Sequence, residues 1–246
     1  MENNKIKAKN IGAVQIFEIN GNFAGEFAKD GQEAMQRTLS KFVFQNLLFN
    51  LKNARYVDTQ GVAAVLNSSS NAHKACVLTD RPEVIDEIQK QIQGKESICI
   101  AHDEFEVSRF FSKEFAQEVN PQQEKRKHIR LKTVVPLEFE FENEMGIQFK
   151  YFAVVTNLSE GGLFADFIHS NVEDRMSCLT GSSSCQFLNL HLYLDSEHLI
   201  HIAGRIAHGD WEEGGLGLEF VGLQSFEKEK IQDWIGAHLR RPDGGL

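Results

Sequence analysis

Two kinds of hydrophobic periodicity divide this 246-residue sequence, and the change between them limits the folds open to it. Before residue 112, short apolar runs alternate with stretches whose apolar residues recur every three or four positions. From Arg130 onward, apolar and polar residues alternate one by one, as in Leu137–Glu142. The first pattern is typical of strands alternating with helices, and the second of strands buried on one face. The sequence therefore predicts two domains of different class.

The N-terminal pattern predicts an α/β sandwich over residues 1–111. Leu47–Leu51 is nearly continuous and apolar, as expected of a strand that is covered on both faces. Asp30–Glu33 has the spacing of a capping box, which predicts that a helix begins at Asp30. The other expected strands are 14–19, 76–78 and 97–101, and further helices are expected near Gly61, after the capping residue Asp80 and from Asp103 to Phe111.

Residues 112–125 are polar and contain Pro121, which predicts a linker. Six short strands are expected beyond it: 137–142, 149–156, 163–167, 187–194, 200–206 and 216–220. A terminal helix is expected to carry Phe226, Trp234 and Leu239. Short strands followed by one closing helix predict a small antiparallel β-barrel with a C-terminal helix over residues 126–241.

Charge and composition argue against several classes of function. The formal net charge is −9, so the chain as a whole is repelled by nucleic acids and by anionic membranes. No apolar run approaches the roughly 20 residues that a membrane-spanning helix needs, and no signal peptide is recognised. A cytoplasmic location is therefore expected. The four cysteines and nine histidines follow no metal-binding spacing, so no metal is expected, and Cys178 and Cys185 are expected to stay reduced.

A basic segment, Lys125–Lys132, contains five Lys or Arg residues and no acid. On composition alone, a solvated basic linker is the ordinary interpretation. Arg126 and Arg130 are four residues apart, however, so in an extended segment both side chains would lie on one face, roughly 13 Å apart. Guanidinium groups can bind phosphate through two parallel hydrogen bonds and can read the O6/N7 edge of guanine. The segment is therefore a candidate nucleotide contact.

A second polar segment, Asn157–Gly162, joins two of the predicted strands. Asn and Ser side chains form hydrogen bonds in turns, and glycines tolerate positive φ and let a ligand approach the backbone. A plain β-turn is the alternative interpretation. This segment is the candidate for the other side of a nucleotide site.

Taken together, RxxxR followed by NxSxxG resembles the PilZ domain family, over about residues 124–240. The resemblance implies that the protein binds cyclic di-GMP, with the arginines holding guanines and phosphates and the second motif holding the opposite side. The implied ligand-binding residues are Arg126, Arg130, Asn157, Ser159 and Gly162. In that family, the residue just before the first arginine, here Lys125, influences how many ligand molecules bind.

The N-terminal half resembles the STAS family of anti-sigma-factor antagonists. The similarity lies in Tyr56–Ala63, where Asp58 and Thr59 precede a predicted helix. In that family the hydroxyl residue after the aspartate is phosphorylated, which makes Thr59 the candidate phosphoacceptor. Gln60 departs from the family, which usually has Ser or Thr there. The alternative is that Asp58 and Thr59 only cap the helix.

These features predict a non-enzymatic cyclic di-GMP receptor that relays binding to an unidentified protein partner through its STAS-like domain. The alternative is a phosphorylation-regulated partner-switching scaffold whose PilZ-like half binds no nucleotide. An enzyme is not expected, because no nucleophile elbow, metal spacing or phosphate-binding loop is recognised. No cofactor, nucleic-acid partner or membrane partner is expected, and a homodimer is left open.

Overall fold

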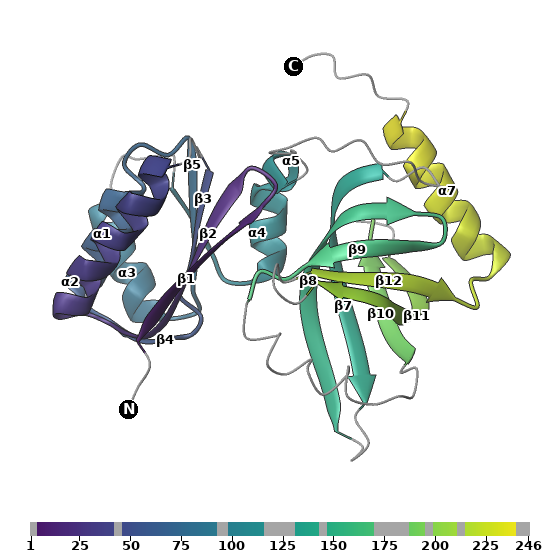
Figure 1. The fold of residues 1–246 in the computed structure, drawn as a ribbon, viewed down its shortest axis with the longest axis horizontal. Helices are drawn as coiled ribbons and strands as arrows, with labels where there is room; N and C mark the ends of the chain where they lie inside the picture. Colours follow the sequence, from purple (N-terminus) through teal and green to yellow (C-terminus); the bar gives the residue numbers. More distant parts are fainter. Residues whose placement is uncertain are drawn as a thin grey trace. The chain divides into compact units, whose positions relative to one another are not determined.

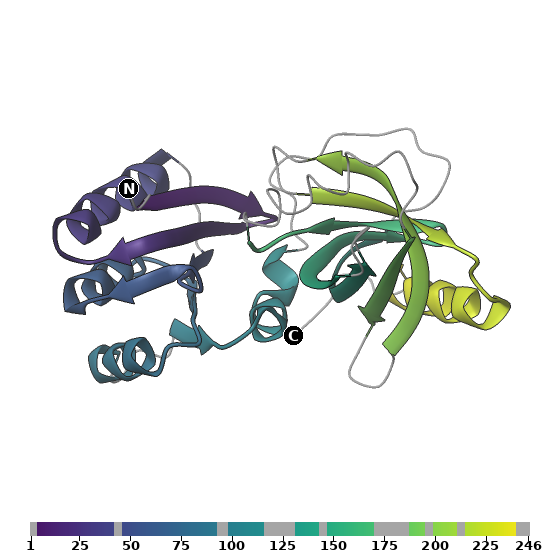
Figure 2. The same cartoon turned by 90° about the horizontal axis from the view of Figure 1, so that it is seen from below.

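The computed structural model describes residues 4–41, 46–92, 98–115, 131–142, 147–169, 187–194, 199–210 and 215–239. The chain separates into two compact units, Met1–Val119 and Asn120–Leu246. Figure 1 and Figure 2 show the α/β character of the first unit and the barrel of the second.

The N-terminal unit is built on a six-stranded, mostly parallel sheet with the order β1-β2-β3-β5-β6, in which β4 also pairs with β2. Among the described strand pairs of this unit, only β1–β2 is antiparallel. All five residues of β3 are buried, as expected for a strand covered on both faces. The strands are β1 (Lys5–Ile11), β2 (Val14–Phe23), β3 (Asn46–Asn50), β4 (Ala54–Val57), β5 (Lys74–Leu78) and β6 (Ile98–Ala101).

The helices of this unit cover both faces of the sheet, with α1, α2 and α3 on one face and α4 on the other (Figure 1). Their apolar stripes bury residues such as Met35, Val65 and Ile88 against the central strands. The helices are α1 (Gly25–Lys41), α2 (Thr59–Ser68), α3 (Pro82–Gln91), α4 (Glu104–Phe110) and the short α5 (Ser112–Phe115). The predicted α/β class of the N-terminal half is therefore confirmed.

The predicted capping box at Asp30 is wrong, because α1 already begins at Gly25. The signal that starts this helix comes from a distant part of the chain: the Gly25 amide donates a hydrogen bond to Oδ2 of Asp58, at 3.0 Å. Gly31 lies inside the helix, where an added Cβ would be only 2.7 Å from both Ile6 Cδ1 and Phe23 Cε2. Glycine at position 31 therefore allows close packing of α1 on β1 and β2, and does not mark a helix start. The cap of α3 also differs from the prediction, because its N-cap residue is Arg81.

The predicted linker begins too early in the sequence. Ser112–Phe115 forms α5, and Phe115 is buried in the N-terminal unit. The Ala13 amide donates to the Glu114 carbonyl at 2.8 Å, which ties α5 to the β1–β2 turn. Residues 116–125 lie outside the described residues, so the end of the linker and the domain limits stay predictions.

The C-terminal unit is a closed barrel with the order β10-β11-β12-β9-β8-β7, and every neighbouring pair on this path is antiparallel. All six predicted strands and the terminal helix are present, so the predicted barrel is confirmed. Its elements are β7 (Leu131–Glu142), β8 (Gln148–Ser159), β9 (Gly162–Asp166), β10 (Phe187–Tyr193), β11 (Leu199–Asp210), β12 (Gly215–Val221) and α7 (Ser225–Leu239).

Alternation along the strands separates the barrel core from the barrel surface. Phe139 stacks on Tyr151 with ring centroids 5.5 Å apart, and Phe141 stacks on the same tyrosine at 5.7 Å. Ile231 and Ile235 of α7 belong to the same core, so the helix covers apolar residues that the strands leave open. Within the described parts of the chain, no helix is long and apolar enough to cross a membrane.

Candidate functional site

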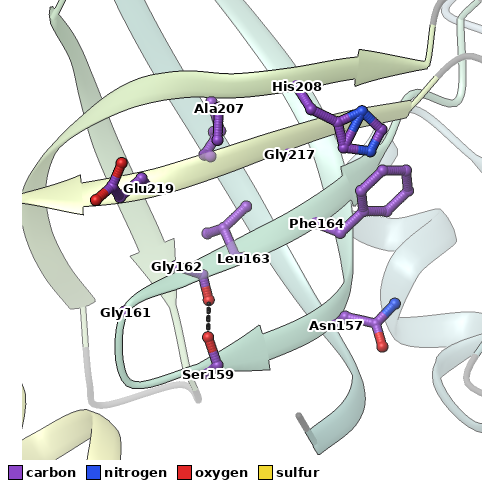
Figure 3. Close-up of a pocket in the computed structure, with 11 residues that line it drawn as sticks. Asn157, Ser159, Gly161, Gly162, Leu163, Phe164, Ala207, His208, Gly217 and Glu219 are labelled. Atoms are coloured by element: carbon purple, nitrogen blue, oxygen red, sulfur yellow. Dashed lines mark hydrogen bonds between the residues drawn. The ribbon is translucent and has the colours of Figure 1, made fainter. Parts of the chain in front are cut away.

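A cavity of about 360 Å³ lies on the barrel beside the turn between β8 and β9 (Figure 3). It brings together residues from β8, β9, β11 and β12. Its lining residues are Asn157, Ser159, Gly161, Gly162, Leu163, Phe164, Ala207, His208, Gly217, Leu218 and Glu219. The three residues of the predicted NxSxxG motif therefore meet at one cavity.

The turn beside the cavity is held by hydrogen bonds at two points. Ser159 Oγ donates to the Gly162 carbonyl at 2.9 Å, which closes the turn internally (Figure 3). The Phe220 amide donates to the Gly161 carbonyl at 3.0 Å, which ties the turn to β12. A neutral hydrogen bond contributes about 1 kcal/mol to stability. The turn therefore has a defined conformation before any ligand arrives.

The glycines of the turn do not use the positive φ that the sequence analysis considered for them. Neither Gly161 nor Gly162 has a positive φ. At Gly162 an added Cβ would collide with the Leu218 carbonyl oxygen, so glycine is needed there for the close approach of β9 and β12. At Gly161 no atom lies within 4 Å of that position, which leaves the backbone open on this side.

Two rings that the sequence analysis missed contribute an aromatic surface to the cavity. The rings of Phe164 and His208 have centroids 5.8 Å apart and are inclined by 34° (Figure 3). Phe164 lies between the buried Leu163 and Ala165 on β9, so its outward position could be predicted from the alternation in the sequence. His208 could not be placed by alternation, because the register of β11 shifts between Ile206 and His208.

The cavity itself offers a carboxylate and no cation among the described lining residues. The carboxylate of Glu219 is held by Arg205, whose Nε and Nη2 lie 2.8 and 2.7 Å from Glu219 Oε2. The start of β7 pairs with the end of β8. Leu131 lies opposite Leu158 and Lys132 opposite Asn157, and these two residues directly follow Arg130 in the sequence.

Comparison with known families supports the assignment of the barrel. Residues 124–237 match the PilZ domain. This part of the chain is a PilZ domain. Its first motif, with Lys125, Arg126 and Arg130, lies outside the described residues, whereas Asn157, Ser159 and Gly162 of its second motif line the cavity.

Solved structures give weaker similarities to each unit. The PilZ domain of CeSA from a cellulose-synthesizing bacterium is 15% identical, with a TM-score of 0.32, 46% of this chain covered and 99% of that chain. YcgR from Escherichia coli in complex with c-di-GMP is 12% identical, with a TM-score of 0.35, 48% of this chain covered and 47% of that one. The anti-sigma factor antagonist SpoIIAA is 13% identical, with a TM-score of 0.34, 43% of this chain covered and 96% of that one. No curated protein matches the sequence. The fold class of each unit is therefore assigned from its own strand order.

Outside the PilZ domain, the predicted phosphoacceptor Thr59 lies at an exposed helix end. Thr59 is the first residue of α2, and its neighbours Tyr56 and Gln60 are also exposed. The cap of α2 comes from Asp58, whose Oδ1 accepts a hydrogen bond from the Gly61 amide at 2.7 Å. Asp58 therefore has a structural role, and the Thr59 hydroxyl is accessible from solvent.

Proposed function

We propose that this protein is a non-enzymatic receptor for cyclic di-GMP that binds the ligand at the cavity beside the β8–β9 turn. The observation that carries the proposal is the register between β7 and β8. This register pairs Leu131 and Lys132, which directly follow the RxxxR motif, with Leu158 and Asn157 of the second motif. The RxxxR motif thus ends one residue before a strand that pairs with β8, and Asn157 and Ser159 of β8 line the cavity. In support, a solved structure of the PilZ domain of YcgR from Escherichia coli contains c-di-GMP.

The proposed site matches the ligand in charge and shape. Cyclic di-GMP carries two phosphates, and the five Lys or Arg residues of Lys125–Lys132 supply the positive charge that the cavity lacks. Arginine binds phosphate and the O6/N7 edge of guanine through paired hydrogen bonds. Phe164 and His208 offer a ring surface against which a flat base can pack.

Calorimetric titration with cyclic di-GMP tests the proposal, with GTP and cyclic GMP as competitors. We expect binding in the nanomolar to micromolar range for cyclic di-GMP alone. Arg130→Ala removes a charge-assisted contact that contributes about 1.5–3 kcal/mol, so affinity should fall roughly ten- to a hundredfold. Arg109→Ala, at an exposed position of α4, is the matched control and should bind as the unmodified protein does. Unchanged affinity in Arg130→Ala would place the site elsewhere.

We further propose that the N-terminal unit passes the signal to a protein partner, with Thr59 as the point of phosphorylation. Support comes from the exposure of Thr59 at the start of α2, beside the exposed Tyr56. A phosphate adds nearly two negative charges and would change how this surface meets an acidic partner. In pull-downs with the full chain, Thr59→Glu should lose partners that Thr59→Ala retains. Identical recovery by the two variants would reduce Thr59 to an ordinary helix residue.

A further inference from the structure

A row of polar side chains on the outer surface of the barrel has the composition of a metal site. Register pairs Glu138 of β7 with His191 of β10, and His191 in turn with His201 of β11. Directly opposed residues on antiparallel strands have Cβ atoms about 4.5–5.5 Å apart. The next row adds Glu140, which lies two residues from Glu138 on the same face. Carboxylates and imidazoles from three adjacent strands therefore meet at one place.

Ligand atoms of three of these four residues already lie close together. One oxygen from each of Glu138 and Glu140 and one ring nitrogen of His191 all lie within 4.8 Å of one another. The rings of His191 and His201 meet edge to face, with centroids 4.6 Å apart. A hollow of about 380 Å³ beside them is lined by Glu140, His191 and His201 among other residues. There is thus space for an ion and its water.

Lys150 of β8 is the group that now balances the two carboxylates. Its ammonium nitrogen lies 2.5 Å from Glu138 Oε1 and 3.7 Å from Glu140 Oε1. Hydrogen bonding to Glu138 raises the pKa of Lys150. Glu138 is buried, so its carboxylate needs a positive partner. Because the lysine side chain is half exposed and flexible, a divalent cation can displace it into solvent.

We propose that Glu138, Glu140, His191 and His201 form a binding site for a divalent transition-metal ion of the zinc class. Two imidazoles and one or two carboxylates are a donor set that Zn²⁺ accepts, with bonds of about 2.0–2.2 Å. Such an ion would join β7, β10 and β11 from outside the barrel. The site is separate from the cavity at the β8–β9 turn, with which it shares no lining residue.

Titration of the tag-free full chain with Zn²⁺ alone tests the proposal. We expect one ion per chain, and an affinity reduced about tenfold or more in His191→Ala and in His201→Ala. His73→Ala is the matched control, because His73 is an exposed histidine of the N-terminal unit. Equal Zn²⁺ affinity in all four proteins, or no binding to the unmodified chain, would overturn the proposal. Circular dichroism of each variant verifies that the barrel is folded.

A second variant tests the same site by a gain of binding. Lys150→Met removes the cation that competes for the carboxylates, so Zn²⁺ affinity should rise. Without Zn²⁺, this variant should melt at a lower temperature than the unmodified chain, because buried Glu138 has lost its partner. Adding Zn²⁺ should raise its melting temperature by more than that of the unmodified chain. A melting temperature of Lys150→Met that Zn²⁺ leaves unchanged would contradict the proposal.

Discussion

Two adjacent glycines in the cavity turn show how differently neighbouring residues of one type can act. Gly162 is required by the closeness of the Leu218 carbonyl, whereas Gly161 faces open space. Gly162→Ala should lower the free energy of unfolding by about 1–3 kcal/mol, because an overpacked contact forces the backbone to shift. Gly161→Ala should leave it unchanged or raise it by about 0.4–1 kcal/mol, because alanine restricts the unfolded chain. Urea unfolding of the two variants distinguishes these outcomes.

A second residue-scale prediction concerns two cysteines on neighbouring strands. Cys76 of β5 is directly opposite Cys99 of β6. A hydrogen bond from the Cys76 thiol stabilises the Cys99 thiolate and lowers the pKa of Cys99 to about 7. Iodoacetamide labelling of Cys99 should therefore reach half its maximal rate near pH 7, because the thiolate is the reactive form.

Replacing the donor gives the control for this titration. In Cys76→Ala the hydrogen bond is lost, so the midpoint for Cys99 should move to higher pH. Mass spectrometry of the peptide that contains Cys99 separates its labelling from that of the other cysteines. A midpoint that is the same in both proteins would mean that Cys76 does not set the reactivity of Cys99.

At the scale of elements, Asp58 holds the starts of two helices. Its two carboxylate oxygens accept hydrogen bonds from the Gly61 amide of α2 and the Gly25 amide of α1. Asp58→Ala should therefore lower the free energy of unfolding by about 2 kcal/mol, which is more than an ordinary N-cap contributes. Gln60 is an exposed residue in the first turn of α2, so Gln60→Ala should change the free energy of unfolding by less than about 0.5 kcal/mol. Chemical denaturation followed by circular dichroism measures both.

The elements that were predicted well are those whose signal is local. Alternation located all six barrel strands, and the continuous apolar run located β3. Both signals are local, because burial on one face or on both faces sets the apolar pattern within the residues of the strand itself. The start of α1 was misplaced because its capping carboxylate, Asp58, is 33 residues away in the sequence. Strand β1 was missed although its lysines alternate with Ile6 and Ala8, which is the period-two signal of a half-buried strand.

The candidate site was predictable only in part, for similar reasons. Asn157, Ser159 and Gly162 form a compact motif whose members the structure brings to one cavity. Phe164 and His208 were missed, since their meeting depends on the β9–β12–β11 pairing and on a register shift. The proposed metal site depends on ligands from three strands, so no spacing rule along the sequence would reveal it.

At the scale of the whole molecule, the basic segment that carries the arginines of the proposed ligand site follows the boundary between the two units in the sequence. Residues 120–132 carry five Lys or Arg and one Glu, and like charges so close together repel one another. The two phosphates of cyclic di-GMP would neutralise that repulsion. Hydrogen exchange in residues 120–132 should therefore slow when the ligand is added, and cleavage by trypsin near Lys125 should decrease. Unchanged exchange at saturating ligand would mean that binding does not order this segment and does not pass a signal to the N-terminal unit through it.

The two units also differ in how their sheets end. The PilZ barrel is closed, so along its ring of strands each strand has a partner on both sides. The N-terminal sheet is open and ends in β1 and β6, which expose backbone groups that a strand from another molecule could pair with. β6 has only four residues, and β1 carries Lys5, Lys7 and Lys9, so both edges discourage such pairing. Among the described strands, resistance to edge pairing at the two ends of this strand path therefore depends on the lysines of β1 and the shortness of β6.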